Sequence, residues 1–98
     1  MTGAAFIGDE LTGAGFRLAG MRVHLADPEH ADRQFQQVLS EAGFVILTNE
    51  VANRLPRTRL REAVARARPP VAIVPAVGSE ERGPDLEREV RVTLGMEA

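Results

Sequence analysis

Short apolar runs alternate along the chain with longer segments of helical periodicity. The runs are continuous instead of alternating with polar residues, which is typical of parallel strands that are covered on both faces. Four such strands are expected, at Ala4–Ile7, Met21–Ala26, Phe44–Leu47 and Val71–Val74. Strands separated by helical segments predict an α/β fold in which helices flank a four-stranded parallel sheet.

The first helical segment is expected from Leu11 to Ala19. Acidic residues directly before it suit a helix N-terminus, and Gly20 supplies a left-handed residue that commonly ends a helix. Glycines at positions 13 and 15 weaken this helix. Its apolar surface is expected from three side chains, Phe16, Leu18 and Ala19.

The second helix has the clearest signals of the chain. Asp27, Pro28 and Glu29 combine a capping side chain with a proline suited to the first helical position, and Gly43 marks the stop. Its apolar stripe is formed by Phe35, Val38, Leu39 and Ala42.

A short helical piece and a longer helix are expected between the third and fourth strands. The short piece runs through Val51, Ala52 and Leu55 and is broken by Pro56. The apolar stripe of the longer helix consists of Leu60, Ala63, Val64 and Ala67.

The composition changes after the fourth strand. Residues 76–84 are rich in Gly, Ser, Pro and charge, and a last segment then carries Leu86, Val90 and Leu94 at a spacing of four residues. We therefore expect an α/β sheet domain at 1–77, a hinge loop at 78–84 and a C-terminal amphipathic helix at 85–98.

Composition narrows the class of protein. The chain has 98 residues, 44% hydrophobic and 27% charged, which fits one water-soluble globular domain. It carries no stretch long enough to span a bilayer and no signal peptide, so a cytoplasmic location is expected. Zero cysteines and two histidines predict no metal site, and no cofactor is expected.

The charged residues point to a protein partner. Net charge is −2, and all twelve basic residues are arginine, so lysine chemistry is excluded. The absence of Tyr and Trp disfavours a base-stacking surface for nucleic acid. We interpret one arginine group, interrupted by acidic residues, as a solvated or partner-facing surface: Arg54, Arg57, Arg59, Arg61, Arg66 and Arg68.

Glycines near the first strand raise the possibility of phosphate binding. Gly8 and Gly13 have the separation of a P-loop, but Ala14 and Gly15 stand where that loop needs lysine and Ser or Thr. A dinucleotide fingerprint fails as well, because Leu18 replaces its third glycine. Nucleotide binding is therefore disfavoured.

A receiver domain has the same order of strands and helices, and Asp9 with Glu10 could imitate its acidic pair. The third strand, however, ends without an aspartate that could accept a phosphoryl group. For catalysis, neither His24 nor His30 has a partner visible in the sequence. Asp9 and Glu10 are expected simply to cap the first helix.

Several stretches resemble the F subunit of the V/A-type (vacuolar/archaeal-type) rotary ATPases. Ile7 to Thr12 leads into Gly15-Phe16-Arg17-Leu18-Ala19-Gly20, which is the most specific element. Residues 43–52 and 70–75 resemble the family's third and fourth strands, and residues 86–96 its C-terminal helix. The resemblance covers nearly the whole chain.

This resemblance implies a non-catalytic central-stalk (rotor) subunit of a V/A-type proton- or sodium-translocating ATPase or ATP synthase, peripheral to the membrane. Its partner would be the coiled-coil shaft subunit of the rotary ATPase, with contact to the catalytic head subunits as an extension. Candidate interface residues are Arg17, Leu86, Val90 and Leu94. The stripe of the last segment could equally fold back onto this chain's own sheet. The competing function is a degenerate receiver-like interaction domain without a phosphoacceptor.

Overall fold

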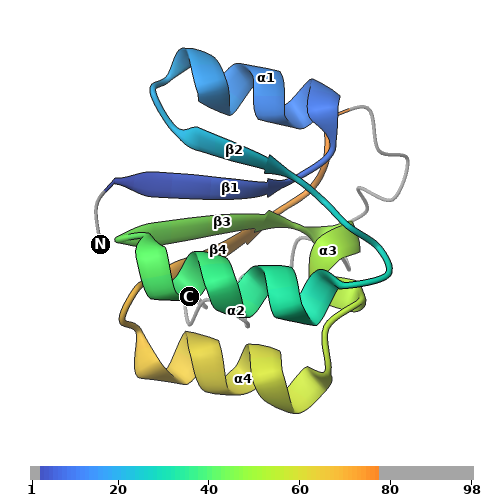
Figure 1. Ribbon diagram of the computed structural model, residues 1–98, viewed down its shortest axis with the longest axis vertical. Helices are drawn as coiled ribbons and strands as arrows, with labels where there is room; N and C mark the ends of the chain where they lie inside the picture. The colour runs from blue at the N-terminus through green and yellow to red at the C-terminus, as the bar shows by residue number, and fades with distance from the viewer. Residues whose placement is uncertain (1–2, 78–98) are drawn as a thin grey trace, which may run out of the picture.

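The computed structural model describes residues 3–77 and contains a four-stranded sheet in which all neighbouring strands are parallel (Figure 1). The strands are β1 (Ala4–Gly8), β2 (Arg22–Leu25), β3 (Phe44–Thr48) and β4 (Val71–Val74). Their order in the sheet is β2-β1-β3-β4. The expected α/β fold is confirmed, and each strand lies close to its predicted bounds.

Residue register aligns the apolar centres of the strands. Ile7 pairs with His24 on one side and Leu47 on the other, and Leu47 pairs with Ile73. The central strands β1 and β3 are buried along most of their length because helices cover both faces of the sheet. The strand order reverses direction between these two strands, so their carboxyl ends form the switch point of the fold.

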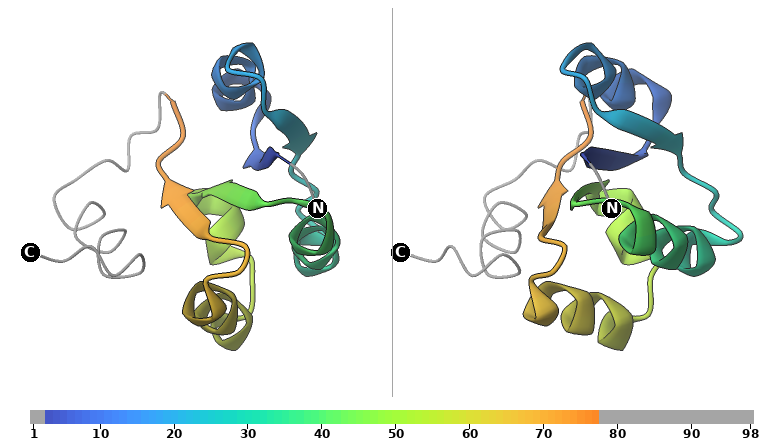
Figure 2. Two further views of the ribbon diagram at one scale, coloured as in Figure 1. Left: turned by 90° about the vertical axis from the view of Figure 1, so that its left-hand side faces the viewer. Right: turned by 60° about the vertical axis from the view of Figure 1, so that its left-hand side comes forward.

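Four helices connect the strands within the described residues, α1 (Glu10–Leu18), α2 (Ala31–Glu41), α3 (Asn49–Asn53) and α4 (Arg57–Arg66). Figure 2 shows α1 on one face of the sheet and the other three helices on the opposite face. Within residues 3–77, one face of the sheet is therefore covered by a single helix and the other face by three.

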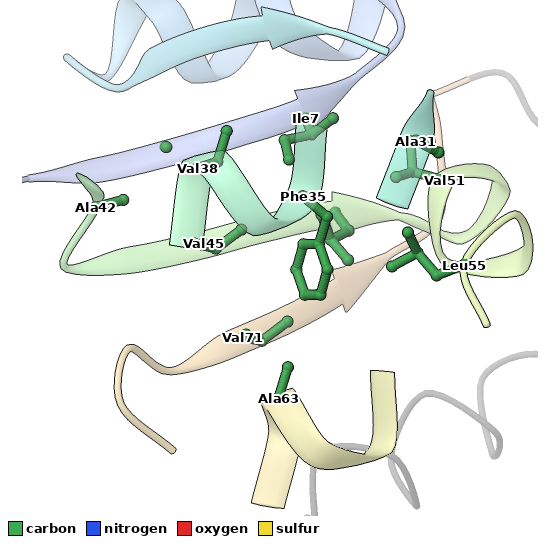
Figure 3. Packing of buried hydrophobic residues seen from close by; sticks show 12 residues of the cluster. Ile7, Ala31, Phe35, Val38, Ala42, Val45, Val51, Leu55, Ala63 and Val71 are labelled. Atoms are coloured by element: carbon green, nitrogen blue, oxygen red, sulfur yellow. The ribbon is translucent and has the colours of Figure 1, made fainter. Parts of the chain in front are cut away.

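The principal core lies between the sheet and helices α2 to α4. Phe35 of α2 is completely buried there, and Figure 3 shows it within a cluster of side chains from the strands and the other helices. The predicted stripe of α2 is confirmed, with Leu39 only partly buried. The cluster consists of Ala5, Ile7, Ala31, Phe35, Val38, Ala42, Val45, Leu47, Val51, Leu55, Ala63 and Val71.

The predicted start of α2 at Asp27 is wrong, because the helix begins only at Ala31. The Asp27 carboxylate does not cap the helix. It instead accepts the Glu29 backbone amide at 3.2 Å and contacts His30 Nδ1 at 3.1 Å, which forms a turn. Gln34 holds this turn against β2, since its side-chain amide donates to the Leu25 carbonyl at 2.8 Å.

Two further expectations need correction. The sequence predicts Leu18 and Ala19 on the packed side of α1, but Leu18 is 91% exposed and Ala19 is exposed as well. Ala67, predicted on the buried stripe of α4, is an exposed residue with a φ of 59°, beyond the end of that helix. Ala76 lies outside any helix or strand, as expected, and is buried; residues 78–98 lie outside the described part of the chain.

Candidate interaction surface

Helix α1 begins at a compact hydrogen-bonded cap. Asp9 is its N-cap residue, and one carboxylate oxygen, Oδ2, accepts both the backbone N–H and the hydroxyl of Thr12, each at 3.0 Å. The Thr12 hydroxyl oxygen in turn accepts the backbone N–H of Val77 at 2.9 Å. The expected capping role of Asp9 is confirmed, and the same residues tie the segment after β4 to the start of α1.

The cap sets the charge state of Asp9. Partial burial acts to raise the pKa of the carboxyl, but the hydrogen bonds from Thr12, assisted by the amides of Asp9 and Leu11, outweigh it and hold the pKa below its ordinary value. Asp9 is therefore an ionised capping group that complements the positive end of the helix dipole. An acid of lowered pKa is a poor proton donor near neutral pH.

The glycines considered for phosphate binding serve packing. A Cβ at Gly8 would lie 2.5 Å from the tip of the Phe6 ring and 2.6 Å from a Thr48 methyl group, and one at Gly13 would lie 2.7 Å from a Val23 methyl group. The space left by both glycines lets the Phe6 ring stack on Phe16 of α1 with centroids 4.8 Å apart. These contacts seat α1 on the sheet.

An open hollow of about 310 Å³ lies at the carboxyl ends of β1 and β3, where receiver domains carry out phosphotransfer. Thr48 occupies the end of β3; it is 1% exposed and its hydroxyl oxygen accepts the Val51 amide at 3.3 Å to cap α3. Acidic side chains of Asp9, Glu10 and Glu50 line the hollow with Arg54. Within residues 3–77, no group of three or more potential metal ligands comes together.

Of the four predicted interface residues, one lies in the part of the chain that the structure describes. Arg17 lies exposed in the last turn of α1, where its charge complements the negative end of the helix dipole. Leu86, Val90 and Leu94 lie outside the described residues.

The arginine group of the sequence is not a uniform basic patch. Arg59 binds Asp32 through two hydrogen bonds of 2.9 and 3.3 Å, and these raise the pKa of its guanidinium. This ion pair joins α4 to α2. The other members, at positions 54, 57, 61, 66 and 68, are exposed. The interpretation as a solvated or partner-facing surface stays a prediction.

The two histidines occupy structural positions. His24 sits within β2, as expected. His30 has a partner that the sequence does not reveal, since it lies against Asp27, and this contact lowers the pKa of the Asp27 carboxyl. Both side chains of this pair are about half exposed, so it fixes a surface turn.

Comparison with known families decides the assignment. A family model described as ATP synthase (F/14-kDa) subunit matches residues 4–91, which include every strand and helix described above. The chain belongs to this family. It is thus placed among the F subunits of the V/A-type rotary ATPases, as the resemblance indicated. A comparison with curated proteins gives no match.

Family membership brings one consequence for the surface. An F subunit associates with the other subunits of its ATPase complex, so part of its exposed surface is an interface. Among the helices described, none is long and apolar enough to cross a membrane.

Two exposed leucines on α1 were not predicted from the sequence as part of a surface. Leu11 is 65% exposed and lies on the same side of α1 as the exposed Leu18. Their spacing of seven residues is a heptad signal visible in the sequence. The prediction misses it because it assigns the apolar residues of a short helix to the side facing the sheet.

Proposed function

We propose that this protein is a non-catalytic central-stalk subunit that binds the coiled-coil shaft subunit of the rotary ATPase and turns with it. In this role it couples ATP hydrolysis or synthesis in the head to proton or sodium transport, and it lies peripheral to the membrane on the cytoplasmic side. The family match over residues 4–91 carries this proposal.

The chemistry of the described residues supports a binding role. Two polar groups at the carboxyl ends of the central strands act as helix caps. One carboxylate oxygen of Asp9 accepts from Thr12, and the Thr48 hydroxyl oxygen accepts the Val51 amide. Capping groups that are committed in this way stabilise the fold and leave no activated nucleophile at these two positions.

We assign the C-terminal stripe of Leu86, Val90 and Leu94 to the shaft, with Arg17 as an additional contact. Full burial of each apolar side chain is worth about 1.5 to 3 kcal/mol, enough to make the stripe a substantial part of the affinity. The family match includes Leu86 and Val90.

Co-expression of the full chain with the shaft subunit of the same genome tests the function. We expect a stable one-to-one complex by size-exclusion chromatography with mass determination. A folded shaft that fails to associate would refute the proposal and favour a receiver-like interaction domain instead.

Truncation after Pro84 tests the assignment of the stripe. We expect the truncated chain to bind the shaft more weakly and to keep its own melting temperature. Unchanged affinity, with a lower melting temperature, would instead place the stripe on this chain's own sheet.

A further inference from the structure

Helix α1 carries apolar residues on the side that faces away from the sheet. Leu11 is 65% exposed and Leu18 is 91% exposed, and the exposed Ala14 and Gly15 lie between them along the helix. These four residues form the outer face of α1. At about 3.6 residues per turn, positions 11, 14, 15 and 18 fall on one side of a helix.

The opposite side of α1 is already occupied. Thr12 is 5% exposed, the position of Gly13 is closed by Val23, and Phe16 stacks on Phe6. The outer face therefore cannot reach the sheet by a rotation of the helix without losing these contacts. A helix that is apolar on both sides is typical of one that is covered on both sides.

Helix α4 shows what a solvated outer side looks like in the same chain. Four of its six exposed positions carry a charge, namely Arg57, Arg61, Glu62 and Arg66, and the other two are Thr58 and Ala65. The outer face of α1, in contrast, holds no charged residue, and the two charges of this helix, Glu10 and Arg17, lie beside it. The apolar outer face therefore distinguishes α1 from α4.

Shape and charge identify the kind of partner. Leu11 and Leu18 are seven residues apart, which matches the heptad repeat of a coiled coil. The small residues between them leave room for a partner helix to approach closely, since nothing lies within 4 Å of a Cβ built at Gly15. Glu10 and Arg17 are also seven residues apart. They would pair with a basic residue and an acidic residue one heptad apart on the partner.

We propose that the outer face of α1 docks against an α-helix of the coiled-coil shaft, with a large apolar side chain of that helix seated over Ala14 and Gly15 between Leu11 and Leu18. The proposal rests on the proposed function and specifies its interface. Arg17 then acts at the edge of this contact and sets the register.

One matched pair of substitutions tests it in the full-length chain. Ala14→Arg places a long charged side chain in the centre of the outer face, and Ala65→Arg places the same side chain at an exposed position of α4. Arginine is a good helix former, so both variants should fold. Leu18→Gln, which removes one edge of the seat, serves as a second variant.

Titration calorimetry with the purified shaft subunit gives the measurement. We expect Ala14→Arg and Leu18→Gln to weaken the affinity by about thirtyfold or more, as for central residues of an interface, and Ala65→Arg to leave it unchanged. Melting temperatures of all three free variants should match that of the wild type.

Each other outcome overturns the proposal in a distinguishable way. Wild-type binding that Ala14→Arg does not weaken would remove α1 from the interface and leave the proposed function intact. Absence of wild-type binding to a folded shaft would refute the function itself. A wild-type dimer that Ala14→Arg dissociates would make the face a contact between copies, and a melting temperature lowered only by Ala14→Arg would show that this chain itself covers the face.

Discussion

Replacing Gly8 with alanine should destabilise this protein, although an alanine that fits its site without strain usually stabilises. Gly8 does not have a positive φ, so an alanine could adopt its backbone conformation. Its added methyl group, however, would lie 2.5 Å from the Phe6 ring and 2.6 Å from Thr48. Both neighbours are at most 1% exposed, so neither can move aside into solvent.

The magnitude follows from two opposing terms. Overpacking a core by one methyl group costs about 1 to 3 kcal/mol. The lower entropy of the unfolded alanine chain offsets about 0.4 to 1 kcal/mol of that cost. We expect Gly8→Ala to lower the free energy of unfolding by about 1 to 2 kcal/mol.

Urea unfolding followed by circular dichroism measures the effect, with Gly15→Ala as the matched control. Gly15 lies within α1 with open space around it, so its alanine variant should be more stable by about 0.5 to 1 kcal/mol. Opposite signs for the two variants are the expected result. A Gly8→Ala protein as stable as the wild type would refute the packing argument.

Three other substitutions test the caps and the core. Asp9→Ala should lower the free energy of unfolding by about 1 kcal/mol at pH 7. Because the pKa of Asp9 is lowered in the folded state, its contribution to stability is present above about pH 4 and is lost as the pH falls through the folded-state pKa. In urea unfolding at about pH 3 the difference from wild type should therefore be smaller, and a difference that does not change with pH would contradict this. Thr48→Val should cost about 1 to 2 kcal/mol in the same assay because the Val51 amide loses its acceptor, whereas a neutral result would mean that another acceptor replaces it. Phe35→Ala should cost about 3 to 5 kcal/mol by thermal unfolding, since the ring is fully buried, and a loss below about 1 kcal/mol would contradict its central place in the core.

Sequence patterns predict the fold class because they report which residues must avoid water. The continuous apolar run Val71–Val74 forms β4 without any change of bounds. The stripe of Phe35, Val38 and Ala42 forms the buried side of α2 and its C-terminal end. In both cases burial on folding is the dominant free-energy term, and it acts through the period of the pattern itself.

The predictions that were wrong depend on particular side-chain contacts that the pattern of apolar and polar residues does not report. Asp27 looks like a helix cap from its neighbours, but Gln34 and His30 hold it in a separate turn. Leu18 looks like a buried residue of α1, but the orientation of that helix is set by Gly13 and Phe6. Neither set of contacts can be inferred from the spacing of apolar residues, and the same holds for the order of the strands.

The two glycines within α1 make this helix intrinsically unstable, so its outer face depends on the contacts that hold the helix in place. Gly13 and Gly15 together cost this short helix about 2 kcal/mol of intrinsic propensity relative to alanine, and a helix of nine residues does not form by itself in water. Helix α1 therefore depends on the Asp9 cap and on the stacking of Phe16 against Phe6. Since the outer face exists only while α1 is folded and seated, whatever displaces the Phe6 ring also displaces both exposed leucines. Partner binding through that face would in return stabilise the seat, because a ligand that binds only the ordered form shifts the equilibrium toward it.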